Sequence, residues 1–127
     1  MDIYLTKTFL AFTKRNPLDE ARIRLSAYEI SCHQYEANLG GNIYKKRIPR
    51  PGSGKRSSYR ALVASDIKLT CFFMQGYAKN EQQSLPRIEL QTLKARANVL
   101  FNYSIYQLHQ LVKCNELRRI YYEQDTR

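Results

Sequence analysis

The residues best suited to chemistry in this sequence are seven cations between Glu36 and Asp66, an interval that contains no acidic residue. They are Lys45, Lys46, Arg47, Arg50, Lys55, Arg56 and Arg60. Because solvated surfaces normally mix charges of both signs, a run of one sign favours a polyanionic ligand over a merely soluble hairpin. Tyr44 and Tyr59 flank the cations, and such basic and aromatic surfaces are typical of proteins that bind single-stranded nucleic acid.

The whole chain shares this bias. Its 127 residues carry 21 Lys and Arg against 11 Asp and Glu, a formal net charge of +10. A basic excess of this size on a small domain points to nucleic acid as the partner. The length fits one domain whose core needs no disulfide or metal for stability.

Cysteine usage and hydropathy indicate the compartment. The three cysteines (Cys32, Cys71 and Cys114) show no C-x-x-C spacing, so neither a disulfide framework nor a zinc site is predicted. We expect each to be a small buried hydrophobic residue in a reducing cytoplasm. No apolar run approaches the ~18 residues of a membrane span, and residues 9–12 are too short for the apolar part of a signal peptide.

Other catalytic patterns are weaker. His33 and His109 stand alone, and an isolated histidine is more often structural than catalytic. The segment Gly52-x-Gly54-Lys55 resembles a phosphate loop only superficially, since it lacks the full spacing and does not open a helix. We therefore exclude a nucleoside triphosphatase.

A period of two predicts the strands that must position the cations. Three of these strands cover residues 42–48, 57–65 and 70–78. The short connection at 66–69 predicts that the last two pair antiparallel. Two prolines and two glycines make residues 49–54 a loop, so most of the cations fall on one strand–loop–strand unit. Residues 1–5 and 117–122 add a first strand and an edge strand.

A period near 3.6 predicts helices on either side of these strands. The first covers residues 16–36, with Asn16 as N-cap and Pro17 in the first turn, and ends at Gly40-Gly41. Its expected buried stripe is Leu18, Ala21, Leu25, Tyr28, Cys32 and Tyr35. A second helix starts near residues 84–86, breaks near 102–104 and is followed by a short helix that ends at Cys114-Asn115. These elements predict an α+β domain with one face of the sheet covered.

The sequence also resembles a known family. Five segments carry the resemblance, in this order: Leu39-Gly40-Gly41, Lys45-Lys46-Arg47-Ile48, Gly52-x-Gly54-Lys55, Tyr59-Arg60 and Gly76-Tyr77-Ala78-Lys79-Asn80-Glu81. They resemble the RelE/ParE superfamily of bacterial toxins, within its RelE- and HigB-like branch. The resemblance implies a RelE-like microbial ribonuclease fold, a twisted antiparallel sheet of four or five strands with N-terminal helices on one face and a C-terminal helix. Residues 1–127 would form one toxin domain, with 103–127 as a helix–strand extension.

The resemblance further implies an endoribonuclease that cuts mRNA in the ribosomal A site. In this reaction the 2′-hydroxyl attacks its own phosphodiester, so no metal or other cofactor is needed. The resemblance implies that Arg60, Lys79 and Arg47 are catalytic. The residues expected to bind RNA are Lys45, Lys46, Arg50, Lys55, Arg56 and Tyr59. Which group is the general base and which the general acid stays open.

The chain departs from close relatives at two places. Ser57-Ser58 replace a frequent Gly-Gly, and Asn80 stands where some relatives carry a second catalytic arginine. Two alternatives are a ParE-like gyrase poison and a non-catalytic RNA-binding module. The resemblance implies a cognate antitoxin, expected to carry a helix-turn-helix DNA-binding part and either to cover the basic cleft or to dock on the helices.

Overall fold

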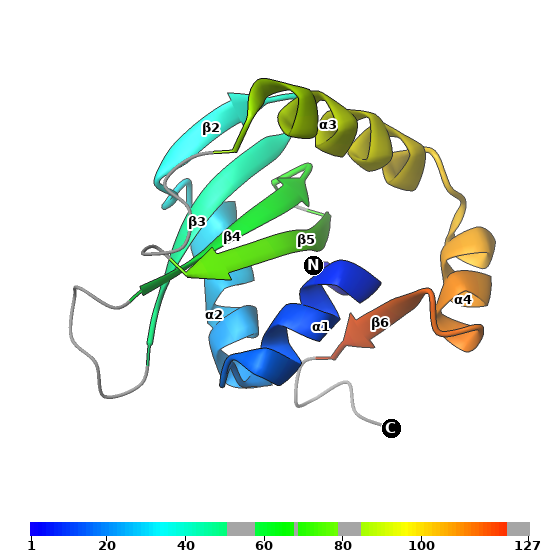
Figure 1. The fold of residues 1–127 in the computed structure, drawn as a ribbon. Helices are drawn as coiled ribbons and strands as arrows, with labels where there is room; N and C mark the ends of the chain where they lie inside the picture. Colours follow the sequence, from blue (N-terminus) through cyan, green and yellow to red (C-terminus); the bar gives the residue numbers. More distant parts are fainter. Residues whose placement is uncertain (51–57, 68, 79–84, 122–127) are drawn as a thin grey trace.

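The computed structural model describes residues 1–50, 58–67, 69–78 and 85–121. Within these residues the strands are β1 (Asp2–Thr6), β2 (Ala37–Gly40), β3 (Ile43–Pro49), β4 (Ser58–Ser65), β5 (Thr70–Ala78) and β6 (Leu117–Ile120). The helices are α1 (Lys7–Arg15), α2 (Glu20–Ser31), α3 (Arg87–Phe101) and α4 (Ile105–Lys113). Figure 1 shows the sheet between α3 on one side and α1 and α2 on the other.

The described strands form one mixed sheet in the order β2-β3-β4-β5-β1-β6. Strand β1 runs parallel to β5, and the other neighbouring pairs are antiparallel. The predicted α+β class, the strands β3 to β5 and the hairpin between β4 and β5 are confirmed. The described sheet has six strands, one more than predicted. The additional strand is β2, which is short and ends in glycine.

The first predicted helix was wrong at both ends. Helix α2 begins at Glu20, since the Asp19 side chain accepts a hydrogen bond from the backbone N–H of Arg22 and caps it. Asn16 instead closes α1, a helix that periodicity did not predict. Helix α2 ends at Ser31, whereas Gly40 ends β2 and Gly41 begins the turn to β3, and both glycines have positive φ angles.

The predicted buried stripe of this helix was correct at Leu18, which is buried just before α2 begins, and wrong within α2. Ile23, Ala27 and Ile30 face the core, whereas Leu25 and Tyr28 are 55% and 61% exposed. The helix carries two apolar stripes, and the one with the β-branched isoleucines packs on the sheet. The other stripe remains on the surface.

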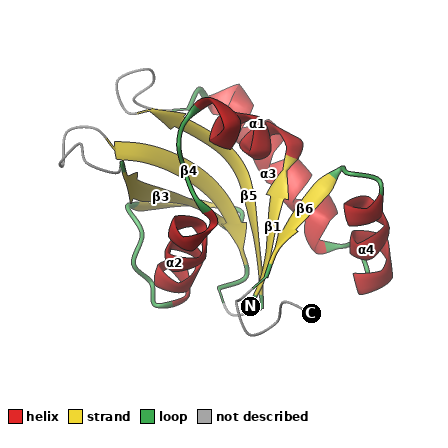
Figure 2. Cartoon of the chain, turned by 90° about the horizontal axis from the view of Figure 1, so that it is seen from below, coloured by secondary structure: helices red, strands yellow, loops and turns green. Residues whose placement is uncertain are grey.

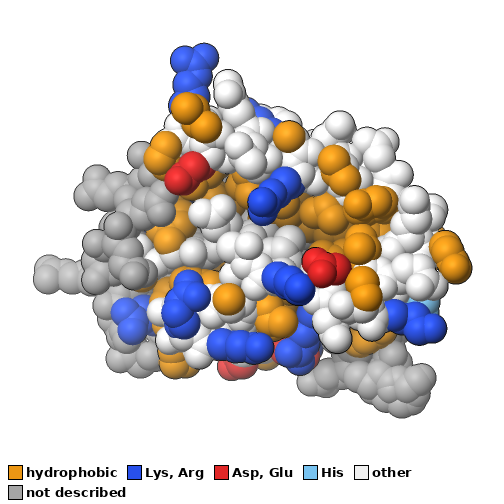
Figure 3. Space-filling model, turned by 45° about the vertical axis from the view of Figure 1, so that its right-hand side comes forward, with side chains coloured by type: hydrophobic (Ala, Val, Ile, Leu, Met, Phe, Trp, Pro, Cys, Tyr) orange, Lys and Arg blue, Asp and Glu red, His pale blue; other side chains and the backbone are white. Residues whose placement is uncertain are grey.

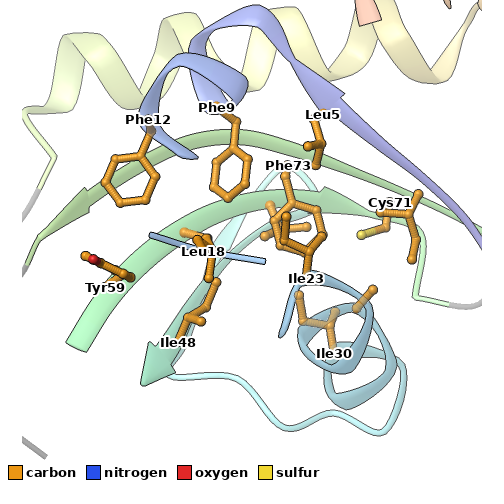
Figure 4. Packing of buried hydrophobic residues seen from close by; sticks show 14 of the residues in the cluster. Leu5, Phe9, Phe12, Leu18, Ile23, Ile30, Ile48, Tyr59, Cys71 and Phe73 are labelled. Carbon is orange, nitrogen blue, oxygen red and sulfur yellow. The ribbon is translucent and has the colours of Figure 1, made fainter. Parts of the chain in front are cut away.

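Helices cover both faces of the sheet, not one as predicted. On the first face, α1 and α2 pack against the sheet through a cluster that includes Phe9, Phe12 and Phe73 (Figure 4). On the other face, Leu93 of α3 and Leu108 of α4 belong to a second buried cluster. Gly76 of β5 fits only as glycine, because a Cβ there would lie 2.5 Å from the Phe12 ring.

The C-terminal elements follow the prediction. Helix α3, the break after it, α4 and the edge strand β6 are confirmed. Figure 2 shows β6 beside β1, with α4 beyond it. None of the described helices combines the length and hydropathy that a membrane span requires. Of the cysteines, only Cys71 is buried; Cys32 and Cys114 are exposed, which corrects the expectation that all three are buried.

Candidate active site

Strands β3, β4 and β5 place a row of polar side chains across one face of the sheet. Arg47 is paired with Arg60, and Arg60 is paired with Tyr77. Side chains of directly paired residues lie on the same face, and Lys45, two residues before Arg47, lies on that face too. The alternation of a strand therefore divides the predicted run of cations, since Lys46 must point to the opposite face.

The Arg60 guanidinium is held in place from two sides. Its Nε donates a hydrogen bond of 2.7 Å to Glu36 Oε1, and its Nη1 donates to Ser58 Oγ. Arg60 is only 7% exposed and Ser58 1%, whereas the Glu36 side chain is 35% exposed. Charge-assisted hydrogen bonds are strong and directional, which gives this guanidinium a fixed orientation.

Glu36 was missed by the sequence reasoning. It precedes β2, and its backbone N–H donates to the carbonyl of Lys45, which brings the carboxylate alongside β3. Its Oε1 also lies 3.7 Å from the Lys45 Nζ. Burial alone would raise the pKa of the Glu36 carboxyl, but the hydrogen bond from Arg60 and the charges of Arg60, Lys45 and Arg47 lower it below the usual value. Its one sequence signal is its position as the last acid before the acid-free interval.

Tyr77 completes the group, which we call the Arg60 site: Glu36, Lys45, Arg47, Arg60 and Tyr77. Burial raises the pKa of the Tyr77 phenol, and the positive charge of Arg60 only partly offsets this effect. The phenol therefore stays protonated at neutral pH and can donate a hydrogen bond or a proton. Sequence reasoning used Tyr77 only as part of a family segment.

Lys46 and Tyr59, both expected to bind RNA, lie on the opposite face. Lys46 is 8% exposed and pairs with Glu29 of α2 at 2.9 Å. Tyr59 is 1% exposed, and its ring meets Phe12 edge-on at 5.3 Å between centroids (Figure 4). Its burial does not favour stacking on a base, so we assign Tyr59 to the core. Arg50 lies over the same ring, 5.2 Å from its centroid.

Three predicted site residues, Lys55, Arg56 and Lys79, lie outside the described residues. Strand β4 begins at Ser58 and β5 ends at Ala78, which pairs with Tyr59 beside Arg60. No group of three or more His, Cys, Asp or Glu side chains that could hold a metal ion occurs within the described part of the chain.

Comparison with known proteins identifies the family of this chain. A sequence model of the family described as the RelE toxin of the RelE/RelB toxin–antitoxin system matches residues 1–120. No curated protein sequence matches the chain significantly. The family match covers every strand and helix described above. The chain therefore belongs to the RelE toxin family and is the toxin of a toxin–antitoxin pair.

Proposed function

We propose that this toxin is a metal-independent endoribonuclease that cuts mRNA on the ribosome. The observation that carries the proposal is the charge of the Arg60 site, where three cations share a single carboxylate. Such an excess in a partly buried site stabilises a phosphate more strongly than the same charges would in bulk water. The family membership supplies the toxic role, and the site suggests how it is exerted.

The reaction makes three demands on the protein. The 2′-hydroxyl must lose a proton, the leaving 5′-oxygen must gain one, and the dianionic phosphorane must be stabilised. Cleavage then leaves a 2′,3′-cyclic phosphate and a 5′-hydroxyl. Arg60 meets the third demand, because within the described residues Glu36 and Ser58 occupy two of its five N–H donors, and the others can bind phosphate oxygens.

The proton transfers involve other residues. Lys45 and Lys46 each contact a carboxylate, so we assign neither of them to the proton transfers. We assign Glu36 to holding Arg60, with its carboxylate ionised at neutral pH. Lys79 and the Tyr77 phenol then exchange protons with the substrate, while Arg47 adds charge beside Arg60.

We place the reaction on cytoplasmic ribosomes. The described part of the chain brings no pair of histidines together of the kind that secreted ribonucleases use. Cutting of free RNA should therefore be slow, and the ribosome would hold the mRNA strand in the geometry that the in-line attack needs.

The antitoxin is expected to cover the Arg60 site or to dock on the helices, and to carry a helix-turn-helix part. The second option is supported by large apolar side chains exposed on α3 and α4: Val99 (52%), Tyr106 (71%) and Ile105 (81%). Figure 3 shows hydrophobic side chains gathered on one face. A hollow of about 420 Å³ between α3 and the residues around the start of α1, with β5, α4 and β6 also in its lining, offers a place for such a contact.

Primer extension on a defined mRNA tests the proposed reaction. The purified chain is added to programmed ribosomes in the magnesium that they require. In parallel it is added to the same mRNA without ribosomes, with magnesium and with a metal chelator. We expect cuts at A-site codons only with ribosomes, and fragments that end in 2′,3′-cyclic phosphate. No cuts in either reaction, from a chain that still arrests growth, would contradict the proposal and favour the gyrase-poison alternative.

A further inference from the structure

A second basic surface lies on the side of the sheet that α2 covers, opposite the face that carries Arg60. Helix α2 and strand β3 line a groove of about 610 Å³ there. Its lining includes Arg22, Leu25 and Glu29 from α2, and Lys46, Arg47 and Arg50 from β3 and the residue after it. We call it the α2–β3 groove. Four of these six residues are cations and one is an acid.

Ion pairing inside the groove leaves an excess of arginine. Glu29 is paired with Lys46 at 2.9 Å, and the Lys46 ammonium also donates to the Gln34 carbonyl at 3.0 Å. These contacts use the one carboxylate and the one lysine to hold the wall of the groove together. Arg22, Arg47 and Arg50 then give it a net positive charge.

Arg22 carries an unsatisfied donor. Its Nε is buried and has no hydrogen-bond acceptor within the described residues. A buried donor without an acceptor costs free energy, and nearly all such groups in proteins find a partner. An anionic oxygen that enters the groove would supply the missing acceptor.

Arg50 is held in place. Its guanidinium lies 5.2 Å from the centroid of the Tyr59 ring, and that ring is fixed in the core with 1% exposure. A cation–π contact on a rigid ring restricts the arginine before any ligand binds, which lowers the entropic cost of binding.

The groove meets the Arg60 site only around the edge of β3. Arg47 lines the groove and is also the residue paired with Arg60 across β3 and β4, whereas Lys46 of the groove lies on the opposite face from Arg60. The pairing of β3 with β2 ends at Lys45, so no described strand covers this edge at Arg47, and an RNA strand that contacts both surfaces would pass around it. Evenly spread guanidinium groups fit the repeating phosphates of a nucleic-acid strand, and each can hold two phosphate oxygens.

We propose that the α2–β3 groove binds the backbone of the substrate RNA strand next to the nucleotide cut at Arg60, with Arg22 as a phosphate contact. This proposal rests on the proposed function, since it extends the path of the same RNA. The exposed Leu25 side chain, at the edge of the groove, offers an apolar surface to a ribose or base.

Fluorescence anisotropy with uncleavable 2′-O-methyl RNA tests the groove. The full chain and its Arg22→Ala variant are titrated with a labelled strand of about 12 nucleotides and with a trinucleotide, a range that spans single-strand site sizes. The matched control is Arg96→Ala, which removes an exposed arginine from α3. Arg22→Lys keeps the charge but loses the forked geometry, and thermal unfolding confirms that each variant is folded.

We expect Arg22→Ala to weaken binding of the longer strand by about tenfold, the effect of one charge-assisted contact. The slope of log affinity against log salt should fall by about 0.7, as for one phosphate contact on a single strand. Arg22→Lys should lose part of this affinity. Arg96→Ala should bind the longer strand almost as well as the wild type, and Arg22→Ala should bind the trinucleotide almost as well as the wild type.

Equal losses for Arg22→Ala and Arg96→Ala would overturn the proposal, as would a chain that binds no RNA. If Arg22→Ala weakens binding of a hexaglutamate peptide but not of RNA, the groove serves an acidic protein partner and the proposal fails. Cleavage is no part of this readout. A chain that binds RNA in the groove yet never cuts it would contradict the proposed reaction and leave the groove intact.

Discussion

Arginine–carboxylate pairs occur at both ends of the sheet, but in different proportions. At the β6 edge, Arg118 pairs with Glu20 at 2.7 Å and Arg119 with Asp2 at 3.0 Å. At the other end, Glu36 is the one acid among the described residues that faces Arg60, Lys45 and Arg47. The β6 pairs are more exposed, with 53% and 35% of the two arginine side chains accessible, against 9% for Arg60.

The difference indicates which end is built for a ligand. Paired and exposed charges contribute little to stability and mainly protect a sheet edge from further strand pairing. Uncompensated and buried charges are costly, so a fold retains them where a ligand supplies the missing anion. The net charge of +10 alone does not distinguish the two ends.

Replacing one tyrosine at each end of the sheet sharpens the comparison, and we expect the largest change in stability at Tyr59. Each end has an arginine over a tyrosine ring, Arg50 over Tyr59 and Arg119 over Tyr121. Tyr59 is 1% exposed and Tyr121 44%. Tyr59→Ala should lower the free energy of unfolding by about 3–5 kcal/mol through loss of a core ring. Tyr121→Ala should lower it by less than about 1 kcal/mol, the range of an exposed cation–π contact.

Urea unfolding of both variants measures these values, with Tyr59→Phe as the control that keeps the ring. Equal losses at Tyr59 and Tyr121 would break the comparison, because they would mean that both ends are equally well packed.

Replacing Gly76 tests how tightly α1 packs against the face of the sheet opposite the Arg60 site. Gly76→Ala places a methyl group 2.5 Å from Cδ2 of the buried Phe12 ring. We expect a loss of about 1–3 kcal/mol in unfolding free energy, the usual cost of overpacking. The double variant Gly76→Ala with Phe12→Leu should recover part of that loss. A Gly76→Ala variant as stable as the wild type would show that the Phe12 ring can move aside.

Glu36 should give the smallest effect on stability, and one that depends on pH. Because the folded-state pKa of Glu36 is lowered, its contribution is present above the ordinary glutamate pKa and disappears as pH falls through the lowered value. Glu36→Gln should therefore cost less than about 1 kcal/mol at neutral pH, since the side chain is 35% exposed and screened by water.

Urea unfolding of wild type and Glu36→Gln across this pH range measures the difference. The gap between the two proteins should close in acid. A gap that widens as pH falls would contradict the assigned ion pair with Arg60.

Much of the fold could be predicted because local patterns and packing agreed. Strands β3 to β5 are rich in β-branched and aromatic residues, and Asn115, at a positive φ, follows α4 as expected. The buried face of α2 was not predicted, because the helix carries two apolar stripes and only contact with the sheet decides which one is buried. Strand β2 failed because its four residues carry too little periodicity to stand out.

The candidate site could be predicted only in part. Arg60 and Arg47 stand out through charge, and the period of two would have separated Lys46 from them. Glu36 and Tyr77 join the site through pairing across strands, a relation that spacing along the chain does not reveal. Tyr59 seemed suited to RNA because aromatic residues in the core and in binding surfaces have the same sequence signal.

The central claim is that the Arg60 end of the sheet cuts RNA and the β6 edge does not. Single-turnover cleavage on programmed ribosomes tests it with wild type, Arg60→Ala and Arg118→Ala, each shown to be folded. The account predicts that Arg60→Ala cuts about 100- to 1,000-fold more slowly, the cost of removing one donor to a developing oxyanion. Arg118→Ala should stay within about twofold of wild type, as expected for a surface substitution. Cutting by Arg60→Ala at the wild-type rate would contradict the account.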